Sequence, residues 1–445
     1  MRYTDLSLVT RRCLTALLVW FAFTNQMPIA AGQSVSDEII LPVSLTQMNA
    51  GTFLRAGLTG KGVKVGIIDA GFYKADSNAS LSRFFPPEGL SLSTKDYIYP
   101  DGKQLFLSHS DLDWHGTQVW SLIGGIVPGQ NRYGLATDAE YFLARTDDGT
   151  KEYAGEQEYL RQALAWLRSK GVRLVNISLG YAYGFDNPAE NYIPANMNGR
   201  TALASTAVEE AISKYNMIIV VAAGNDGDND WKILSAPADA KDVITVGATD
   251  EKKEKKEFSS EGPDFLPYLK PDLSCMNYTG GTSFSAPAIT GMVACMLQKD
   301  PHLSNARIKE ILKRSGHLYP YGNNFEGYGV PDAARILQLM DHPGSRSGRT
   351  SRLISKSDTL NISLSDEERA LTLFHKKDKW VVLRQDKLDT TGTKRVTIQR
   401  PAPCKRSHLV VDDKMQSKYH LETTTETVAR TTFVTNKRVV EIIWP

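Results

Sequence analysis

Apolar residues recur along the first three quarters of the chain in short blocks that alternate with amphipathic stretches. The run at 62–69 (GVKVGIID) has no polar face, which is typical of a strand buried on both sides of a parallel sheet, and 139–145 (AEYFLAR) is similar. Segment 158–171 (EYLRQALAWLRSKG) instead places its apolar residues on roughly one helical face and stops at a glycine. These patterns predict alternating strands and helices from residue 62 to residue 340.

The alternation continues with a strand-like run at 172–180, a helical pattern at 202–216, and strand-like runs at 217–225 and 242–250. Strand, helix and strand at this spacing imply right-handed crossovers. We therefore predict an α/β fold with a doubly wound, mostly parallel sheet. Functional groups in such folds gather at the carboxyl ends of the strands.

The pattern changes after Met340. Residues 342–352 are polar and contain Gly and Ser, which is typical of a linker. From 353 to 445, short alternating runs separated by turns predict a smaller all-β domain of the sandwich type. The predicted order is a leader at 1–32, a short segment at 33–51, the α/β domain at 52–341, the linker, and the β domain.

The first residues have the pattern of an export signal. Arg11 and Arg12 precede the apolar run at 13–23, and small residues follow up to Gly32. The apolar run is too short to span a bilayer. We therefore expect cleavage after Gly32, no transmembrane anchor, and a secreted, periplasmic or cell-surface protein.

Composition narrows the classes further. With 445 residues, 41% of them hydrophobic, the chain can bury a large core in two or three domains. The net charge is +2, but residues 342–445 carry 20 Lys and Arg against 12 Asp and Glu. A basic tail is compatible with nucleic acid or an anionic surface, yet these charges are scattered between strand-like runs. We interpret them as a solvated surface and expect no nucleic-acid partner.

Cysteine usage gives no framework for disulfides or zinc. Loss of the leader would remove Cys13 and leave Cys275, Cys295 and Cys404, which are widely spaced along the chain. We expect Cys275 and Cys295 to be free thiols in the core.

Residues 280–291 (GGTSFSAPAITG) place Gly-Thr-Ser at the mouth of a predicted helix. We expect Thr282 to act as the N-cap and Ser283 to lie in the first turn, where free backbone N–H groups and the helix dipole favour an oxyanion. The glycines before Ser283 would let a substrate backbone approach. Taken alone, the pattern is more often an ordinary helix cap.

A serine hydroxyl becomes a strong nucleophile only beside a base and a group that orients that base. His115 in DWHGTQVW begins an apolar helical pattern, whereas His109 lies in a polar run typical of a loop. Asp69 ends the most hydrophobic early strand, and a carboxylate so close to a core needs a partner. Asn225 ends another apolar strand. Its amide could donate to an oxyanion beside the Ser283 backbone N–H, or it could be a turn asparagine.

These four groups, in the order Asp, His, Asn, Ser, resemble the subtilisin-like serine peptidases, the subtilases. The matching motifs are VGIIDAGF, HGTQV, VVAAGN and GTSFSAP, with NISLG and GYGVPDAARIL as further matches, and the resemblance covers residues 52–340. It implies a secreted serine endopeptidase that acts on protein or peptide substrates through an acyl-enzyme and requires no cofactor. Ser283 would attack the peptide carbonyl and His115 would take and return the proton. Asp69 would orient the imidazole, and Asn225 would hold the oxyanion.

The resemblance also implies a substrate cleft with two walls. One wall would pair with the substrate backbone as an added strand and consists of Ser178, Leu179 and Gly180. The other would line the pocket for the side chain before the cut bond and consists of Ala222, Ala223 and Gly224. Small residues on that side predict a roomy, mainly apolar pocket.

The sequence departs from the family pattern at several places. Ala70 follows the aspartate where the family usually has a hydroxyl residue, and Trp120 occupies a position where a small residue is commoner. The loop at 270–283 is short, which predicts a reshaped cleft. The 19 residues between Gly32 and Thr52 are too few for the folding propeptide of many secreted relatives, so either the protein folds without one or the export signal is misassigned.

Other interpretations stay open at this point. A catalytically idle subtilase fold could serve as a binding or scaffold module, with the β domain as its working part. An esterase with the same triad is less favoured, because GTSFSAP is not the Gly-x-Ser-x-Gly pattern. In an active peptidase, the β domain would aid stability, secretion, or docking to a surface or another protein. The acidic residues Asp226, Asp228 and Asp230 fit a structural calcium ion, although such a cluster is more often only solvated.

Overall fold

The computed structural model describes residues 41–86, 92–101, 104–127, 129, 131–277, 280–345, 350–388, 393–411 and 419–445. The predicted leader at 1–32 lies outside these residues. No helix in the described ranges is both long enough and apolar enough to cross a membrane.

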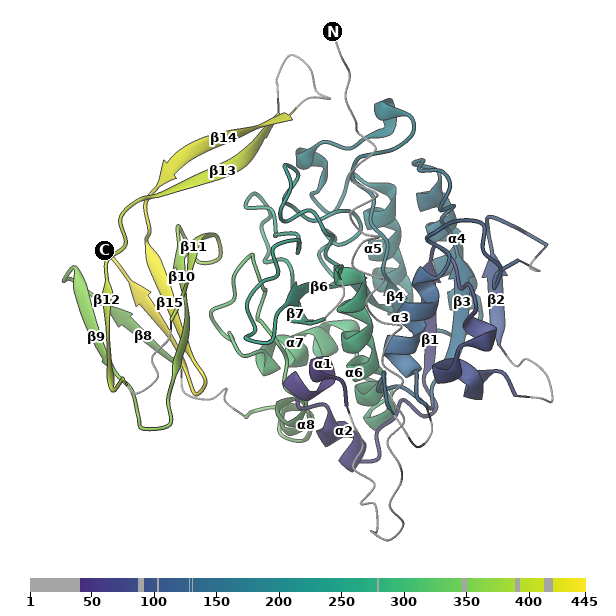
Figure 1. Cartoon of the computed structure of the whole chain (residues 1–445), viewed down its shortest axis with the longest axis horizontal. Coiled ribbons are helices and arrows are strands. Elements are labelled where there is room, and N and C mark those ends of the chain that lie inside the picture. The colour runs from purple at the N-terminus through teal and green to yellow at the C-terminus, as the bar shows by residue number, and fades with distance from the viewer. Residues whose placement is uncertain are drawn as a thin grey trace, which may run out of the picture.

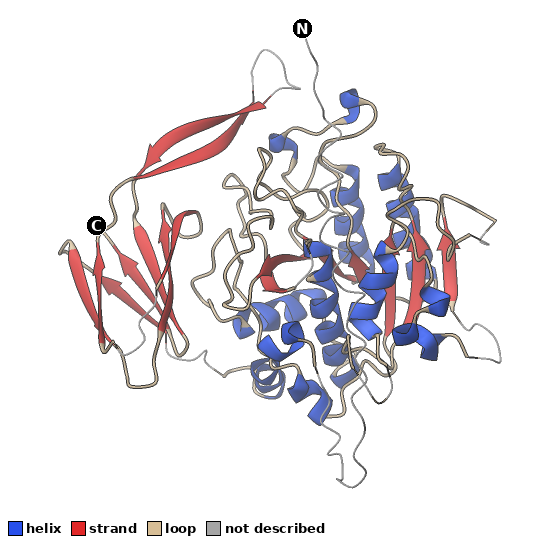
Figure 2. Ribbon diagram, viewed as in Figure 1, coloured by secondary structure: helices blue, strands red, loops and turns tan. Residues whose placement is uncertain are grey.

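A parallel sheet of seven strands forms the centre of the larger domain, in the order β2-β3-β1-β4-β5-β6-β7 (Figures 1 and 2). Its strands are β1 (Lys64–Asp69), β2 (Ser93–Asp96), β3 (Glu140–Arg145), β4 (Leu174–Ile177), β5 (Ile218–Ala222), β6 (Ile244–Thr249) and β7 (Leu273–Met276). Strand β1 lies inside the sheet, with β3 and β2 on one side and β4 to β7 in chain order on the other, as in a doubly wound sheet. The predicted α/β fold is confirmed.

Helices cover both faces of this sheet. The longer ones are α3 (His115–Gly124), α4 (Glu156–Ser169), α5 (Leu203–Tyr215), α6 (Ala286–Lys299), α7 (Asn305–Ser315) and α8 (Ala333–Asp341). Alternate residues of β1 separate the two layers: Val65 and Ile67 pack in the core of α3 and α6, and Ile68 packs in the core of α4 and α5. Burial on both faces explains why β1 has no polar side.

Short helical turns complete the larger domain. They are α1 (Val43–Gln47), α2 (Gly51–Arg55), η1 (Ala75–Ser77), η2 (Ala79–Phe84), η3 (Pro188–Glu190), η4 (Pro194–Asn196) and η5 (Thr282–Phe284). Leu45, Met48 and Ala50 belong to the same core as α3 and α6, and the Met48 carbonyl accepts a hydrogen bond from the Ala333 N–H. The core therefore includes residues ahead of the predicted start at 52. Helices of five residues are too short to show a helical period in sequence.

The C-terminal residues form smaller antiparallel and mixed sheets. The strands are β8 (Thr350–Ile354), β9 (Thr359–Ser363), β10 (Ala370–Lys376), β11 (Val382–Lys387), β12 (Arg395–Gln399), β13 (Cys404–Val411), β14 (Tyr419–Glu426), β15 (Arg430–Thr435) and β16 (Val439–Ile443). Five of them pair in the order β11-β10-β15-β16-β8, while β9 pairs with β12 and β13 with β14. Ile362 of β9 and Ile398 of β12 share an apolar core with Phe433 of β15, in the five-stranded sheet. The expected small all-β region is confirmed.

Strand β8 begins at Thr350, inside the segment that composition predicts as linker. Its backbone pairs in parallel with β16, and Thr350 lies opposite Val439. The partner strand is distant in sequence, so the local composition around Thr350 does not report the pairing.

Candidate active site

The four candidate residues come from elements that meet at the carboxyl edge of the sheet. Asp69 is the last residue of β1, and His115 is the first residue of α3. Asn225 follows the end of β5, and Ser283 lies in η5 between β7 and α6. The fold therefore brings together residues that are far apart in sequence.

Asp69 and His115 are in direct contact. Asp69 Oδ1 lies 2.7 Å from His115 Nδ1, and the same oxygen accepts the Ala70 N–H at 2.9 Å. The Asp69 side chain is fully buried, and that of His115 is 16% exposed. Among the described residues, no partner reaches the buried Oδ2 of Asp69, and Ala70 has no hydroxyl to offer. Asp69 thus makes both of these hydrogen bonds through Oδ1, the oxygen that faces Nδ1 of the imidazole.

The charge on the imidazole depends on two carboxylates. Burial opposes the imidazolium, but the charge and hydrogen bond of Asp69 and the charge of Asp147 raise the pKa of His115 above its ordinary value. Asp147 follows β3 and accepts a hydrogen bond from the Tyr181 hydroxyl at 3.0 Å. Burial raises the pKa of Asp147 to about 6.

Ser283 is buried, and its hydroxyl donates to the Ser178 carbonyl at 3.2 Å rather than to His115. In return, the Ser178 hydroxyl donates to the Ser283 carbonyl at 3.0 Å. The structure therefore joins Asp69 to His115 but leaves the link from His115 to Ser283 unformed. Such contacts are often loose before substrate binds.

The expected cap at Thr282 is wrong. Gly281 precedes η5 with a φ of 141°, a region that favours glycine, and α6 begins only at Ala286. The Thr282 hydroxyl instead lies 3.0 Å from the Gly224 N–H and 3.1 Å from Asn225 Oδ1. The sequence pattern of an N-cap is real, but a tertiary partner takes the hydroxyl.

Asn225 is oriented by the same contact. Its Oδ1 accepts the Thr282 N–H at 2.7 Å, which leaves the Nδ2 group as a donor. A Cβ built on Gly281 would lie 3.6 Å from that nitrogen, so the amide faces the turn that carries Ser283.

The two expected cleft walls follow adjacent, parallel strands. Residues 178–180 come directly after β4, and Ala222 ends β5, which pairs with β4. Gly180 lies so close to Ser235 that a Cβ there would approach its hydroxyl to 2.3 Å, and Gly224 has a φ of 109°. Leu179 packs against the core of α4 and α5. Substrate binding by these residues stays a prediction.

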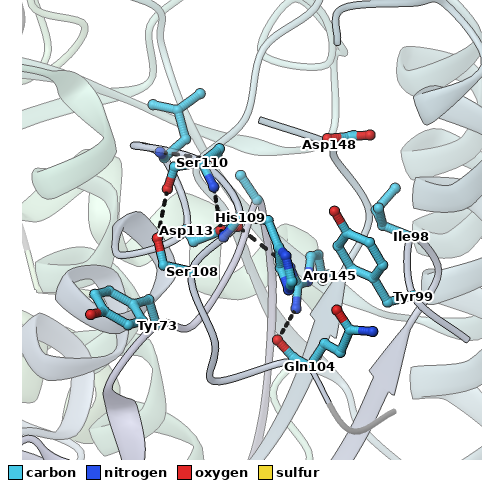
Figure 3. A network of polar contacts seen from close by, with 12 residues as sticks. Tyr73, Ile98, Tyr99, Gln104, Ser108, His109, Ser110, Asp113, Arg145 and Asp148 are labelled. Carbon is cyan, nitrogen blue, oxygen red and sulfur yellow. Dashed lines mark hydrogen bonds and ion pairs between the residues drawn. The ribbon is translucent and has the colours of Figure 1, made fainter. Parts of the chain in front are cut away.

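A buried arginine connects this edge to the chain segment before His115, which Figure 3 shows. Arg145 ends β3 beside Asp69 and is 1% exposed. It lies 2.9 Å from Asp96 and 3.4 Å from Asp113, and it donates to the Gln104 carbonyl at 2.6 Å. The sequence shows one signal for this residue, a charge at the end of the apolar run at 139–145.

Asp113 ties the same segment together. Its Oδ2 accepts the backbone N–H groups of His109 and Ser110. Its own carbonyl accepts the Tyr73 N–H at 2.7 Å, just after Asp69 in the chain. His109 lies in this loop, as expected, and its ring packs on Tyr99 with the centroids 4.4 Å apart.

The remaining sequence features lie around the site. Trp120 is fully buried among Phe84, Phe85 and Tyr141, so it fills the core under α3. Cys275 and Cys295 are buried free thiols, and burial raises the pKa of each to about 12.

The three aspartates considered as calcium ligands do not converge on one site among the described residues. Asp226 accepts hydrogen bonds from the Tyr183 hydroxyl at 2.6 Å and from Asn229 Nδ2 at 2.7 Å. Within the described ranges, no group of three or more His, Cys, Asp or Glu side chains could hold a metal ion. Calcium binding at Asp226, Asp228 and Asp230, which the sequence favours less than solvated carboxylates, stays untested.

Comparison with known proteins agrees with this arrangement. The model of the subtilase family matches residues 60–329. The chain belongs to the subtilase family. This membership makes it a subtilisin-like serine endopeptidase.

Two known proteases match similar shares of this chain. Subtilisin E of Bacillus subtilis (strain 168) is 26% identical over 297 residues, which are 63% of this chain and 68% of that protein. M-protease of Shouchella clausii (strain KSM-K16) is 27% identical over 299 residues, 64% of this chain and 67% of that protein.

Among solved structures, the CspB protease of Clostridium perfringens has a TM-score of 0.54 and 18% identity, over 67% of this chain and 99% of that one. MycP1 from Mycobacterium smegmatis has a TM-score of 0.50 and 21% identity, over 68% and 86%. These structural likenesses show the fold of the subtilase domain.

Asp147→Asn tests the electrostatics of His115. The substitution removes a negative charge that favours the imidazolium, so the His115 pKa falls. NMR titration of the imidazole should show the lower pKa, and the acidic limb of the kcat/KM profile should move to lower pH. The control Asp148→Asn changes the next carboxylate in the chain and should leave the His115 pKa and the acidic limb of the kcat/KM profile unchanged. Equal shifts in the two variants, or a rise in the pKa, would contradict this account.

Asp113→Asn and Asp96→Asn test whether the arginine contact positions the histidine segment. Each variant removes one carboxylate from Arg145, but only Asp113 lies in the segment that leads to His115. Comparable losses in melting temperature are expected. Asp113→Asn should lower kcat roughly 10- to 100-fold more than Asp96→Asn, because small misplacements at reacting groups are costly. Losses of kcat that simply follow melting temperature in both variants would rule out positioning.

Proposed function

We propose that this subtilase hydrolyses peptide bonds through Asp69, His115 and Ser283, with Asn225 as oxyanion donor and an acyl-enzyme intermediate. The observation that carries the proposal is the buried 2.7 Å contact between Asp69 and His115, beside the turn that holds Ser283. A buried carboxylate bonded to an imidazole is the orienting half of a nucleophilic triad.

The proposed reaction begins with rotation of the Ser283 hydroxyl away from the Ser178 carbonyl and toward His115 Nε2. His115 accepts the hydroxyl proton as the oxygen bonds to the substrate carbonyl carbon. Asp69 holds the Nδ1–H and stabilises the imidazolium. The same proton passes to the leaving amine as the peptide C–N bond breaks, and water then repeats the sequence on the ester.

Asn225 and the backbone N–H of Ser283 are the proposed donors to the oxyanion. The Thr282 contacts hold the Asn225 oxygen and direct Nδ2 toward the Gly281 turn. Loss of one such donor costs about 3–4 kcal/mol of transition-state stabilisation in comparable sites.

The proposed substrate is a protein or peptide whose backbone pairs with residues 178–180 as an added strand. The side chain before the cut bond would lie against Ala222, Ala223 and Gly224, and the proposal is that these small residues leave room for an apolar group. Esterase activity alone is less favoured, since the nucleophile motif is not Gly-x-Ser-x-Gly.

We propose export from the cytoplasm on the pattern of the leader at 1–32. One relative supports export by its name, the minor extracellular protease Epr of Bacillus subtilis (strain 168). It is 26% identical to this chain over 59% of this chain and 36% of its own length.

Labelling with a fluorophosphonate probe tests the proposed nucleophile. The full-length protein should react at Ser283, located by mass spectrometry of the labelled peptide. Ser283→Ala should abolish labelling, and His115→Ala should abolish or greatly slow it, because the hydroxyl then lacks its base. Absence of label on a folded wild-type protein would refute the proposal and favour the binding or scaffold module. Cleavage of ester but not amide substrates would favour the esterase.

A further inference from the structure

The β domain is joined to the subtilase domain by an apolar contact. Leu318, in the connection before α8, is fully buried in a cluster with Phe374 of β10, Val382 of β11 and two further valines of the small sheet. Tyr321 and Phe325 pack against the same cluster. In Figure 1, β10 and β11 are the strands of the small sheet on the side nearest the larger domain.

Asn324 links both domains through its polar groups. It is 3% exposed, its backbone N–H donates to the Trp380 carbonyl at 3.1 Å, and its Oδ1 accepts the Val382 N–H at 2.9 Å. Its Nδ2 donates to the Gly262 carbonyl at 3.1 Å, and its own carbonyl accepts the Gly262 N–H at 2.9 Å. Asn324 therefore fastens the edge strand of the β domain to residues 258–264, which we call the bracing segment.

A second contact fixes the far end of the bracing segment. Arg406 of β13 forms an ion pair with Asp264 at 2.6 Å, and the Arg406 side chain is 15% exposed. The segment is thus held at two points: Asn324, which is itself bonded to the β domain, holds Gly262, and Arg406 of the β domain holds Asp264.

The near end of the bracing segment supports the residues around Asn225. The Ser260 N–H donates to the Gly224 carbonyl at 3.1 Å, and the Ser260 hydroxyl accepts the Asp226 N–H at 3.0 Å. The Gly227 N–H donates to the Phe258 carbonyl at 2.9 Å. The residues on both sides of Asn225 are therefore bonded to Ser260.

We infer that the β domain positions the pocket wall and the oxyanion asparagine of the subtilase domain, through Asn324 and the bracing segment. The inference rests on the proposed roles of Gly224 and Asn225. Asn324 and Arg406 act as positioning residues: they hold the backbone that sets where the Asn225 amide points and how close Gly224 lies to the substrate side chain. The β domain is then part of the specificity apparatus of the enzyme.

A second ion pair between the domains supplies a matched control. Lys387 of β11 pairs with Glu254 at 2.5 Å, and Lys387 is 71% exposed at its side chain. Glu254 precedes the bracing segment, and its carbonyl accepts the Asp250 N–H. Loss of this ion pair removes a link between domains without removing either hold on Gly262 or Asp264.

The experiment compares Asn324→Ala, Arg406→Ala and Lys387→Ala in the full chain. Two peptide substrates that differ only in the side chain before the cut bond are used, and kcat and KM are measured for each. Asn324→Ala and Arg406→Ala should lower kcat and change the ratio of the two kcat/KM values by roughly 3- to 30-fold, the range expected of residues that couple through contacts. Lys387→Ala should retain the wild-type kcat and ratio.

Equal effects of Arg406→Ala and Lys387→Ala, or a lower melting temperature with an unchanged ratio, would overturn the inference. Arg406→Ala keeps the test decisive if Asn324→Ala does not fold. Fluorophosphonate labelling of the wild type separates the two levels of the account. Labelled wild type with unaffected variants rejects only the bracing role, whereas an unlabelled wild type rejects the proposed function beneath it.

Discussion

The site depends on the contact between one buried carboxylate, that of Asp69, and the imidazole of His115. A charge taken out of water is costly unless it is hydrogen-bonded and paired. The Asp69 side chain is fully buried, and its carboxylate is hydrogen-bonded to His115 Nδ1 and the Ala70 N–H. The end of β1 and the start of α3 must therefore meet, and the other candidate residues lie around that contact.

A second buried charge supports the first. Arg145 lies opposite Asp69 in the sheet register, but its partners are Asp96, the Gln104 carbonyl and Asp113. It thus connects the sheet to the loop before His115 at the edge where Asp69 holds the imidazole. Around Asn225 the contacts are neutral hydrogen bonds, in which Thr282 and Ser260 hold Asn225 and its neighbours. Charged contacts hold the segment before His115, and neutral hydrogen bonds hold Asn225 and its neighbours.

Much of this arrangement could be predicted from sequence, because strands buried on both faces leave continuous apolar runs. Such runs predicted β1, β4 and β5, and hence the place of Asp69 at the end of β1; Asn225, expected to end its strand, lies three residues after β5 ends at Ala222. Features that depend on distant partners could not be predicted. The Thr282 hydroxyl bonds to Asn225 and Gly224 instead of capping a helix, and β8 pairs with β16 from a segment with the composition of a linker. The hydrogen bonds of Asn324 to Gly262 and to Val382 of the β domain likewise could not be predicted from the local sequence, an Asn-Asn dipeptide.

The most direct test of the central claim is the turnover number of Asp69→Asn. An amide keeps the size of the carboxylate but loses its charge and favours the wrong imidazole tautomer, so the fold should persist while kcat falls on the order of 10⁴-fold. Circular dichroism and thermal melting of the same sample establish that the variant is folded. A folded Asp69→Asn enzyme with kcat near that of the wild type would contradict the account, because His115 would then act without the carboxylate on which the site is built.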